Sequence, residues 1–95
     1  MTTYVILSKL SPLAFDEPGK FKDVAAKVAT EIKERCPGTT WRESYATTGR
    51  YDCVDIIETD NPNEVTRAAM IIRGFGRSTT ETLTATPWKE FIGNL

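Results

Sequence analysis

The chain has 95 residues, of which 40 % are hydrophobic, and its 12 basic and 13 acidic side chains give a formal net charge of −1. This size and apolar content fit one small folded domain over residues 1–95 and exclude a disordered chain. The balanced charge lacks the basic surface that nucleic acid or an anionic membrane would require, so we expect neither as a partner.

The first residues, MTTYVILSKLSP, contain neither the basic start nor the long apolar run of a signal peptide. No segment approaches the ~20 apolar residues of a membrane span. We therefore expect a cytoplasmic protein in which Cys36 and Cys53 are reduced. Histidine is absent, which removes the commonest general base and the commonest metal ligand. Because no Cys, Asp and Glu residues have metal-ligand spacing, we expect no metal and no cofactor.

The first half of the chain predicts a strand, a helix and a second strand. Residues 3–10 are β-branched and aromatic, and prolines and a glycine then interrupt the chain. Apolar residues three and four apart over 19–35 predict an amphipathic helix that ends before Cys36-Pro37-Gly38. Threonines and aromatic residues over 40–48 predict the second strand. The apolar stripe of the helix consists of Phe21, Val24, Ala25, Val28 and Ile32.

The second half predicts a strand, a helix and a last strand. Gly49 to Asp52 turn the chain into the apolar strand 53–59. In Asn61-Pro62-Asn63-Glu64, asparagine suits a helix N-cap, proline the first helical position and glutamate the third. We expect this helix to reach about Arg73, with Gly74 as its C-cap, before a threonine-rich strand over 77–86. The tail, residues 87–95, predicts one helical turn that docks Trp88 and Phe91.

The order β-α-β-β-α-β predicts a ferredoxin-like α+β fold, in which a four-stranded antiparallel sheet carries two helices on one face. The strand 53–59 is apolar on both faces, since Val54 and Ile56 alternate with Cys53, Asp55 and Ile57. A monomer would expose a large apolar patch on the open face. We expect a homodimer with sheet packed on sheet. The alternative is that the C-terminal tail covers this face.

A sheet-on-sheet dimer can enclose a cavity, where polar side chains of the open face would bind a small molecule. By alternation we place Asp55 on that face as the leading candidate. Tyr45 and Glu81 join it if their strands have the expected register. The structural alternative is that Asp55 is partly buried in an ion pair with an Arg or Lys of its own or the partner chain.

The hairpin Gly49-Arg50-Tyr51-Asp52 and the element order resemble the GYD-domain family of small, mostly uncharacterised proteins. The opening TYVILSKLSP, Ser44-Tyr45 and the run Thr80-Glu81-Thr82-Leu83-Thr84-Ala85 are similar to that family too. The resemblance implies a ferredoxin-like fold that pairs into a dimeric α/β barrel. It carries no established activity. Two features depart from the family pattern: Asp55, where a small or apolar residue is expected, and the segment Leu13 to Lys22.

The hairpin has a structural and a functional interpretation. Gly49 supplies the positive φ of a tight turn, Asp52 accepts backbone N–H groups, and the ring of Tyr51 lies on the domain. In the functional interpretation, Arg50 binds a carboxylate at a cavity mouth and Tyr51 donates to an enolate-like oxygen. Cys53 is better read as a small buried hydrophobe than as a nucleophile, because no histidine can activate it.

Three functions remain open at this point. The first is a non-catalytic homodimeric module that binds a small molecule or another protein. The second is a cofactor-independent enzyme of monooxygenase or isomerase type, acting on a small carbonyl or phenolic compound, in which Asp55, Tyr51 or Glu81 moves a proton. The third is a stabilising subunit of a larger complex. The absence of histidine, of a metal motif and of a nucleophile–base pair favours the first.

Overall fold

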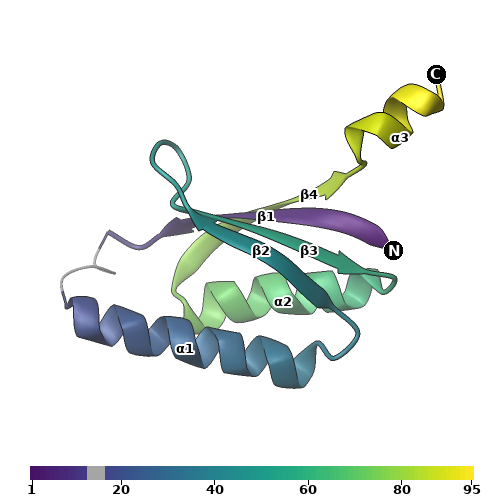
Figure 1. Ribbon diagram of the computed structural model, residues 1–95. Coiled ribbons are helices and arrows are strands. Elements are labelled where there is room, and N and C mark those ends of the chain that lie inside the picture. Colours follow the sequence, from purple (N-terminus) through teal and green to yellow (C-terminus); the bar gives the residue numbers. More distant parts are fainter. Residues whose placement is uncertain (13–16) are drawn as a thin grey trace.

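A computed structural model describes residues 1–12 and 17–95 (Figure 1). It confirms the ferredoxin-like order of elements, and a short third helix follows the last strand. Residues 13–16 of the segment that departs from the family pattern lie outside the described residues. The elements are β1 (Thr2–Leu10), α1 (Pro18–Arg35), β2 (Thr40–Ala46), β3 (Cys53–Thr59), α2 (Pro62–Phe75), β4 (Ser78–Ala85) and α3 (Trp88–Gly93).

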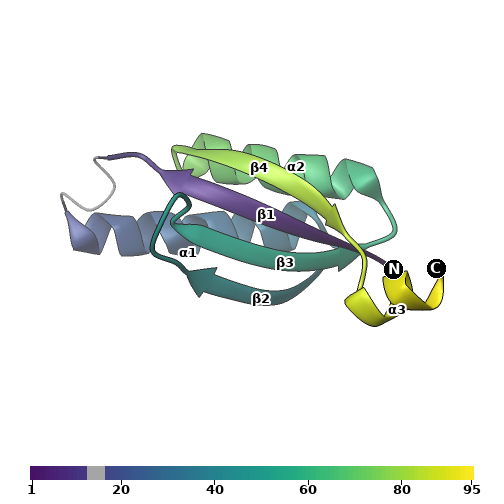
Figure 2. The same cartoon turned by 90° about the horizontal axis from the view of Figure 1, so that it is seen from above.

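The four strands form one antiparallel sheet in the order β2-β3-β1-β4. Both long helices lie on one face of this sheet, and the other face is open (Figures 1 and 2). Ile6 of β1 pairs with Asp55 of β3 and with Thr82 of β4, and this row faces the helices. The next row, through Leu7, faces away from them.

The core lies mainly between α2 and the sheet. Ile6 and Ile57 are completely buried, and Val65, Ala68 and Ile72 of α2 pack in the same cluster. On α1, by contrast, the apolar residue that is buried to this extent is Ile32. Seen from above, α2 lies along the β4 side of the sheet and α1 along the β2–β3 side (Figure 2).

The start of α2 confirms the predicted cap and shows a different use of the glutamate. The Asn61 side chain accepts a hydrogen bond from the Asn63 N–H at 3.0 Å. Glu64 does not close a capping box, because the Asn61 N–H donates to Thr59 Oγ1 at 3.1 Å. Glu64 Oε1 instead accepts from the Gly38 N–H at 2.8 Å. Glu64 therefore ties the start of α2 to the turn that follows α1.

The predicted C-cap at Gly74 is wrong, because α2 continues through Phe75 and is capped by Gly76. The Gly76 N–H donates to the Ile72 carbonyl at 2.9 Å. A Cβ atom on Gly76 would lie 2.4 Å from that carbonyl oxygen, so the close approach requires glycine. Arg77 follows with a φ of 50°, in the left-handed region where the chain leaves the helix.

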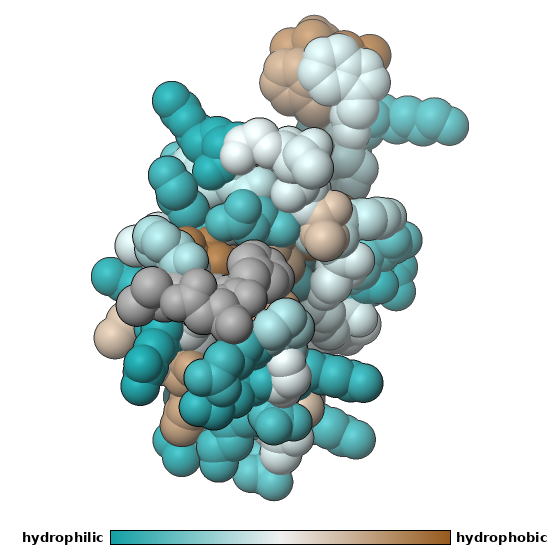
Figure 3. All heavy atoms as spheres, turned by 90° about the vertical axis from the view of Figure 1, so that its left-hand side faces the viewer, coloured by the Kyte–Doolittle hydropathy of each residue, from teal (hydrophilic) through white to brown (hydrophobic). Residues whose placement is uncertain are grey.

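The tail forms the predicted helical turn, α3, but its docking was predicted wrongly. Trp88 is 72 % exposed and Phe91 45 % exposed, and α3 stands clear of the sheet (Figure 1). Their rings contact each other, with centroids 5.6 Å apart, rather than the body. In the space-filling view the C-terminal end projects above a largely hydrophilic flank as an apolar knob (Figure 3). The extended backbone of Pro87 directs α3 outward, so the tail leaves the open face uncovered.

Candidate functional site: a cavity between α1 and the sheet

A cavity of about 860 Å³ lies between α1 and the helix-facing side of the sheet. Strands β1, β2 and β3 form its floor, and Trp41 lies in its wall. This volume falls within the range of roughly 300–1,000 Å³ that is usual for small-molecule pockets. The apolar stripe predicted on α1 forms the roof together with Ala29, which was not part of the prediction; the stripe consists of Phe21, Val24, Ala25, Val28 and Ile32.

The cavity exists because α1 packs along α2 rather than down onto the sheet. The C-terminal end of α1 is anchored, since Ile32 and Cys36 belong to the core cluster and Arg67 Nη1 donates to the Arg35 carbonyl at 2.7 Å. Earlier in the helix, Val24 and Val28 remain partly exposed. The stripe that amphipathicity predicted is present, but much of it faces the cavity instead of a packed sheet.

A polar strip, defined as Ser44, Asp55, Cys53 and Ser8, crosses the floor of the cavity. Asp55 is only 7 % exposed. Its Oδ1 atom accepts a 2.5 Å hydrogen bond from Ser44 Oγ, and its Oδ2 atom accepts a 3.5 Å contact from the Cys53 thiol. Trp41 Nε1 donates to Ser44 Oγ at 2.8 Å and holds that hydroxyl toward Asp55.

The expectation that Asp55 lies on the open face is wrong. Asp55 pairs with Ile6, so it belongs to the face that the helices cover. Alternation correctly grouped Cys53, Asp55 and Ile57 but could not decide which face of the sheet the helices take. Within residues 1–12 and 17–95, no arginine or lysine forms an ion pair with Asp55, so the predicted partner from its own chain is not seen there.

Ser8 contributes an unpartnered hydroxyl to the same floor. Its residue is 2 % exposed, and its Oγ atom has no hydrogen-bond partner within the part of the chain that the structure describes. A buried hydroxyl without a partner costs about 1–3 kcal/mol. Ser8 was not among the site residues predicted from the sequence, although a serine among the alternating apolar residues of TYVILSKL is a signal that could have found it.

Cys53 is electrostatically unsuited to nucleophilic chemistry. Burial, the charge of Asp55, its hydrogen bond to the thiol and the charge of Asp52 together raise the pKa of the Cys53 thiol to about 11. The thiol therefore stays protonated at neutral pH and acts as a donor to Asp55.

Three of the other predicted residues lie away from the floor of the cavity. Tyr45 and Glu81 are on the open face, in the row that also contains Leu7 and Val54, and Tyr45 borders the cavity rim as well. The Tyr51 hydroxyl donates to Glu81, and this bond raises the pKa of the Tyr51 phenol. In the same way, the Tyr45 hydroxyl donates to Glu43, which raises the pKa of Tyr45. The structure therefore divides the predicted set between two faces of the sheet.

The Gly49–Asp52 hairpin is accounted for by backbone geometry. Gly49 has a φ of 126°, the positive value predicted for this turn. Asp52 Oδ2 accepts from the Leu10 N–H at 2.8 Å, and the Asp52 N–H donates to the Ser8 carbonyl at 2.9 Å. Arg50 is exposed at the tip. The aspartate thereby fastens the end of β1 beside the cavity, where Asp52 is itself a lining residue.

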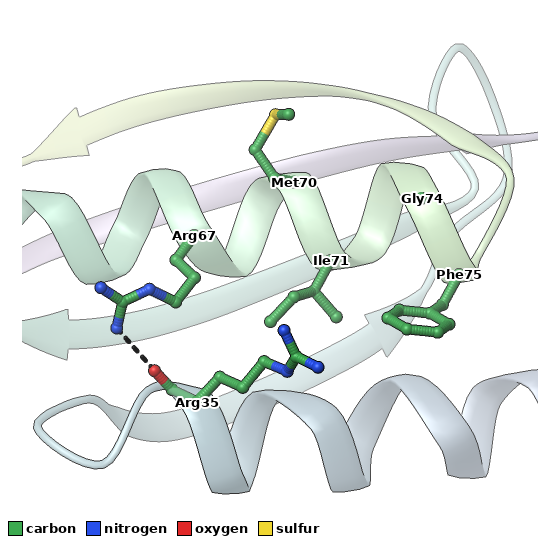
Figure 4. A pocket seen from close by; sticks show the side chains of 6 residues that line it. All are labelled: Arg35, Arg67, Met70, Ile71, Gly74 and Phe75. Carbon is green, nitrogen blue, oxygen red and sulfur yellow. Dashed lines mark hydrogen bonds between the residues drawn. The ribbon is translucent and has the colours of Figure 1, made fainter.

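A second, smaller hollow of about 360 Å³ lies on the outer side of the two helices (Figure 4). The Arg67 guanidinium there points to the end of α1 and donates to the Arg35 carbonyl. Lys27 Nζ lies 5.4 Å from the ring centroid of Phe75. These contacts join α1 to α2. The hollow is lined by Arg35, Arg67, Met70, Ile71, Gly74 and Phe75.

Two features are absent from the described part of the chain. None of its helices is long and apolar enough to cross a membrane. No three Cys, Asp or Glu side chains of residues 1–12 and 17–95 are grouped so that they could hold a metal ion.

Comparison with known proteins identifies the family. The family described as GYD domain matches residues 4–95, which is nearly the whole chain. The chain belongs to the GYD domain family. This confirms the resemblance drawn from the hairpin and the strands. No curated protein matches the chain.

Two solved structures show the same fold as this GYD-domain chain. One is a hypothetical protein, PHS023 from Pyrococcus horikoshii, with 20 % identity, a TM-score of 0.53 and 92 % of each chain covered. The other is FFRP-DM1, with 24 % identity and a TM-score of 0.53 over 90 % of this chain and 100 % of that chain. At these identities the likeness concerns the fold alone.

Proposed function

We propose that this GYD-domain protein is a homodimeric module that binds a small molecule in the cavity between α1 and the sheet. The observation that carries the proposal is the cavity itself, about 860 Å³ in a chain of 95 residues. Its lining is mostly apolar, with a few convergent polar groups on the floor, as in known ligand sites. This location replaces the inter-sheet cavity expected from the sequence.

A ligand would complete the packing that α1 lacks. The cavity is open to solvent, so the apolar residues of α1 that line it are left without a packing partner, which function can explain. A bound apolar molecule would cover Val24 and Val28 at about 25 cal/mol per Å² of buried area. It would also give Ser8 Oγ a hydrogen-bond partner, which this atom does not have among the described residues.

The open face supports the homodimer. Val5, Leu7, Val54 and Ile56 lie on it and are only half buried, and Leu83 is 43 % exposed. The radius of gyration is 14.1 Å, compared with about 12 Å for a compact chain of this length, because α3 extends from the body. A second copy placed sheet to sheet would cover the apolar patch and offer a surface to each α3.

The same cavity leaves an enzymatic role as a second candidate. Asp55 faces an apolar cavity, and no ion pair within the described residues seals it. A carboxylate so placed is a suitable general base for a small carbonyl or phenolic compound. The two candidates share one binding site and differ in whether the bound molecule leaves chemically changed.

Native mass spectrometry and a dye titration test the binding module together. We expect a dimer mass, and increased fluorescence when the neutral, apolar dye Nile red is added. In Ala25→Trp the new indole fills the cavity, so Nile red affinity should fall at least tenfold. The matched control is Ala26→Trp, at an exposed position of α1 that does not line the cavity, which should bind as the wild type does. Equal binding by both variants would contradict the cavity site, and a monomer at micromolar concentration would contradict the dimer.

A further inference from the structure

The charges that line the cavity are mainly negative. Asp52 and Asp55 line it, and Lys33 is the one basic side chain among its described lining residues. Asp52 Oδ2 is already bonded to the Leu10 N–H. Within the described part of the chain, the hydrogen bonds to Asp55 come from two side chains, the Ser44 hydroxyl and the Cys53 thiol. Asp55 is therefore the carboxylate that is still available to a ligand.

No cation of the described residues forms an ion pair with Asp55, although Lys33 lines the same cavity. An ionised carboxylate that is largely removed from water is costly unless it is both hydrogen-bonded and paired with a cation. Ser44 and Cys53 provide hydrogen bonds to it, but neither carries a charge. No ion pair supplies the charge within residues 1–12 and 17–95.

Ser8 places a second acceptor near Asp55. Ser8 pairs with Cys53 across β1 and β3, and Asp55 is two residues further along β3 on the same face. Such diagonal neighbours are about 7–8 Å apart at their Cα atoms. An ammonium group has three N–H donors and no acceptor, so one nitrogen between them can donate to Asp55 and to the unpartnered Ser8 Oγ.

The raised pKa of the Cys53 thiol indicates a negative electrostatic potential at this end of the cavity. After burial, the charges of Asp55 and Asp52 are what raise its pKa. Both carboxylates therefore act on a group in the middle of the polar strip. A cation at the same place would be attracted by both.

We propose that the ligand is a small apolar molecule that carries a primary ammonium group, which Asp55 and Ser8 bind while the stripe of α1 covers the apolar part. This inference rests on the proposed binding function and adds the chemical class of the ligand. A neutral alcohol of the same shape can hydrogen-bond to Asp55 but brings no charge. A carboxylate is repelled by Asp55 and Asp52.

The test is displacement of Nile red at pH 7 by three compounds that share one ring system. These are 1-naphthylmethylamine, 1-naphthalenemethanol and 1-naphthoate. We expect the amine to displace the dye at least ten times more strongly than the alcohol, and the naphthoate to be the weakest. In Asp55→Asn the amine should lose this advantage while Nile red still binds. In Asp23→Asn, which removes a charge from the exposed surface of α1, the advantage should remain.

Each outcome has a separate meaning. If Nile red binds but the amine and the alcohol compete equally, the ammonium inference is overturned while the binding function stands. The same holds if Asp55→Asn keeps the advantage of the amine, or if naphthoate competes best, which would assign the site to an anion held by Lys33. If Nile red does not bind the wild type, the binding function itself fails.

Discussion

The two long helices cover the same face of one sheet, yet they bury their residues very differently. α2 has 14 residues and buries six of them, whereas α1 has 18 and buries Glu31 and Ile32. The helix with more turns therefore contributes less to the core. The difference indicates a division of roles, in which α2 and β1 stabilise the fold and α1 encloses a space.

The two buried acids show the same contrast. Glu64 and Asp55 are each 7 % exposed. Glu64, on α2, accepts from the backbone of Gly38 and lies near the Thr39 hydroxyl. Asp55 faces the cavity and is bonded by two neighbouring side chains. Glu64 ties a helix to the turn after α1, whereas the bonds of Asp55 stay within the sheet, from Ser44 on β2 and from Cys53 on its own strand.

Replacing an alanine by leucine on the sheet-facing side of each helix should give the largest difference in the free energy of unfolding. Ala68 is completely buried under the sheet, so Ala68→Leu overpacks the core and should lower the free energy of unfolding by about 3 kcal/mol. Ala25 faces the cavity, and Ala25→Leu should change it by less than about 1 kcal/mol, because the added atoms enter open space. Urea denaturation of both variants measures the difference. Equal losses would show that α1 packs on the sheet as tightly as α2 does.

Replacing each of the two buried acids by alanine should give the next largest difference in the free energy of unfolding. Glu64→Ala leaves the Gly38 N–H without its acceptor and should cost about 1–3 kcal/mol. Asp55→Ala removes an acid that has no ion pair in the described chain, so the loss should stay below about 1 kcal/mol. Urea denaturation at pH 7, with circular dichroism to confirm the fold, measures both. A larger loss for Asp55→Ala would make Asp55 a structural residue and weaken its assignment to a ligand.

The sequence predicted the elements and their order because each depends on local chemistry. The Asn61-Pro62 cap, the positive φ of Gly49 and the backbone bond of Asp52 are local features, and the structure confirms all three. Residue type could not choose between Gly74 and Gly76, because either glycine can end a helix. The choice depends on how closely the chain passes the Ile72 carbonyl. The predicted strands 40–48 and 77–86 are shorter in the structure, at Thr40–Ala46 and Ser78–Ala85.

The candidate site was predicted only in part, and the missing information is tertiary. Alternation places Asp55 with Cys53 and Ile57, but β3 is apolar on both faces, so nothing local tells which face the helices cover. The stripe on α1 indicates amphipathicity, and its distance from the sheet depends on packing against α2. Ser8 gains importance only because the helix above it leaves room.

The reactivity of Cys53 tests the electrostatics of the cavity floor beneath α1, where the smallest effect is expected. In a Cys36→Ala background, alkylation by iodoacetamide reports on Cys53 alone. Because the pKa of this thiol is raised from 9.0 to about 11, its rate should keep rising with pH beyond 9. At pH 8 the smaller thiolate fraction, partly offset by greater nucleophilicity, should make it about tenfold slower than an ordinary thiol.

Removing the neighbouring charge should change that rate in a known direction. Asp55→Asn takes away a charge and an acceptor that keep the Cys53 proton in place, so its pKa falls and alkylation at pH 8 becomes a few times faster. Glu64→Gln is the matched control, because it removes a buried acid of the α2 side that does not contact Cys53. A rate that levels off near pH 9, or a rate that Asp55→Asn leaves unchanged, would show that the carboxylates do not raise the pKa of Cys53. The negative potential assigned to the floor of the cavity would then be wrong, while the packing difference between the two helices would stand.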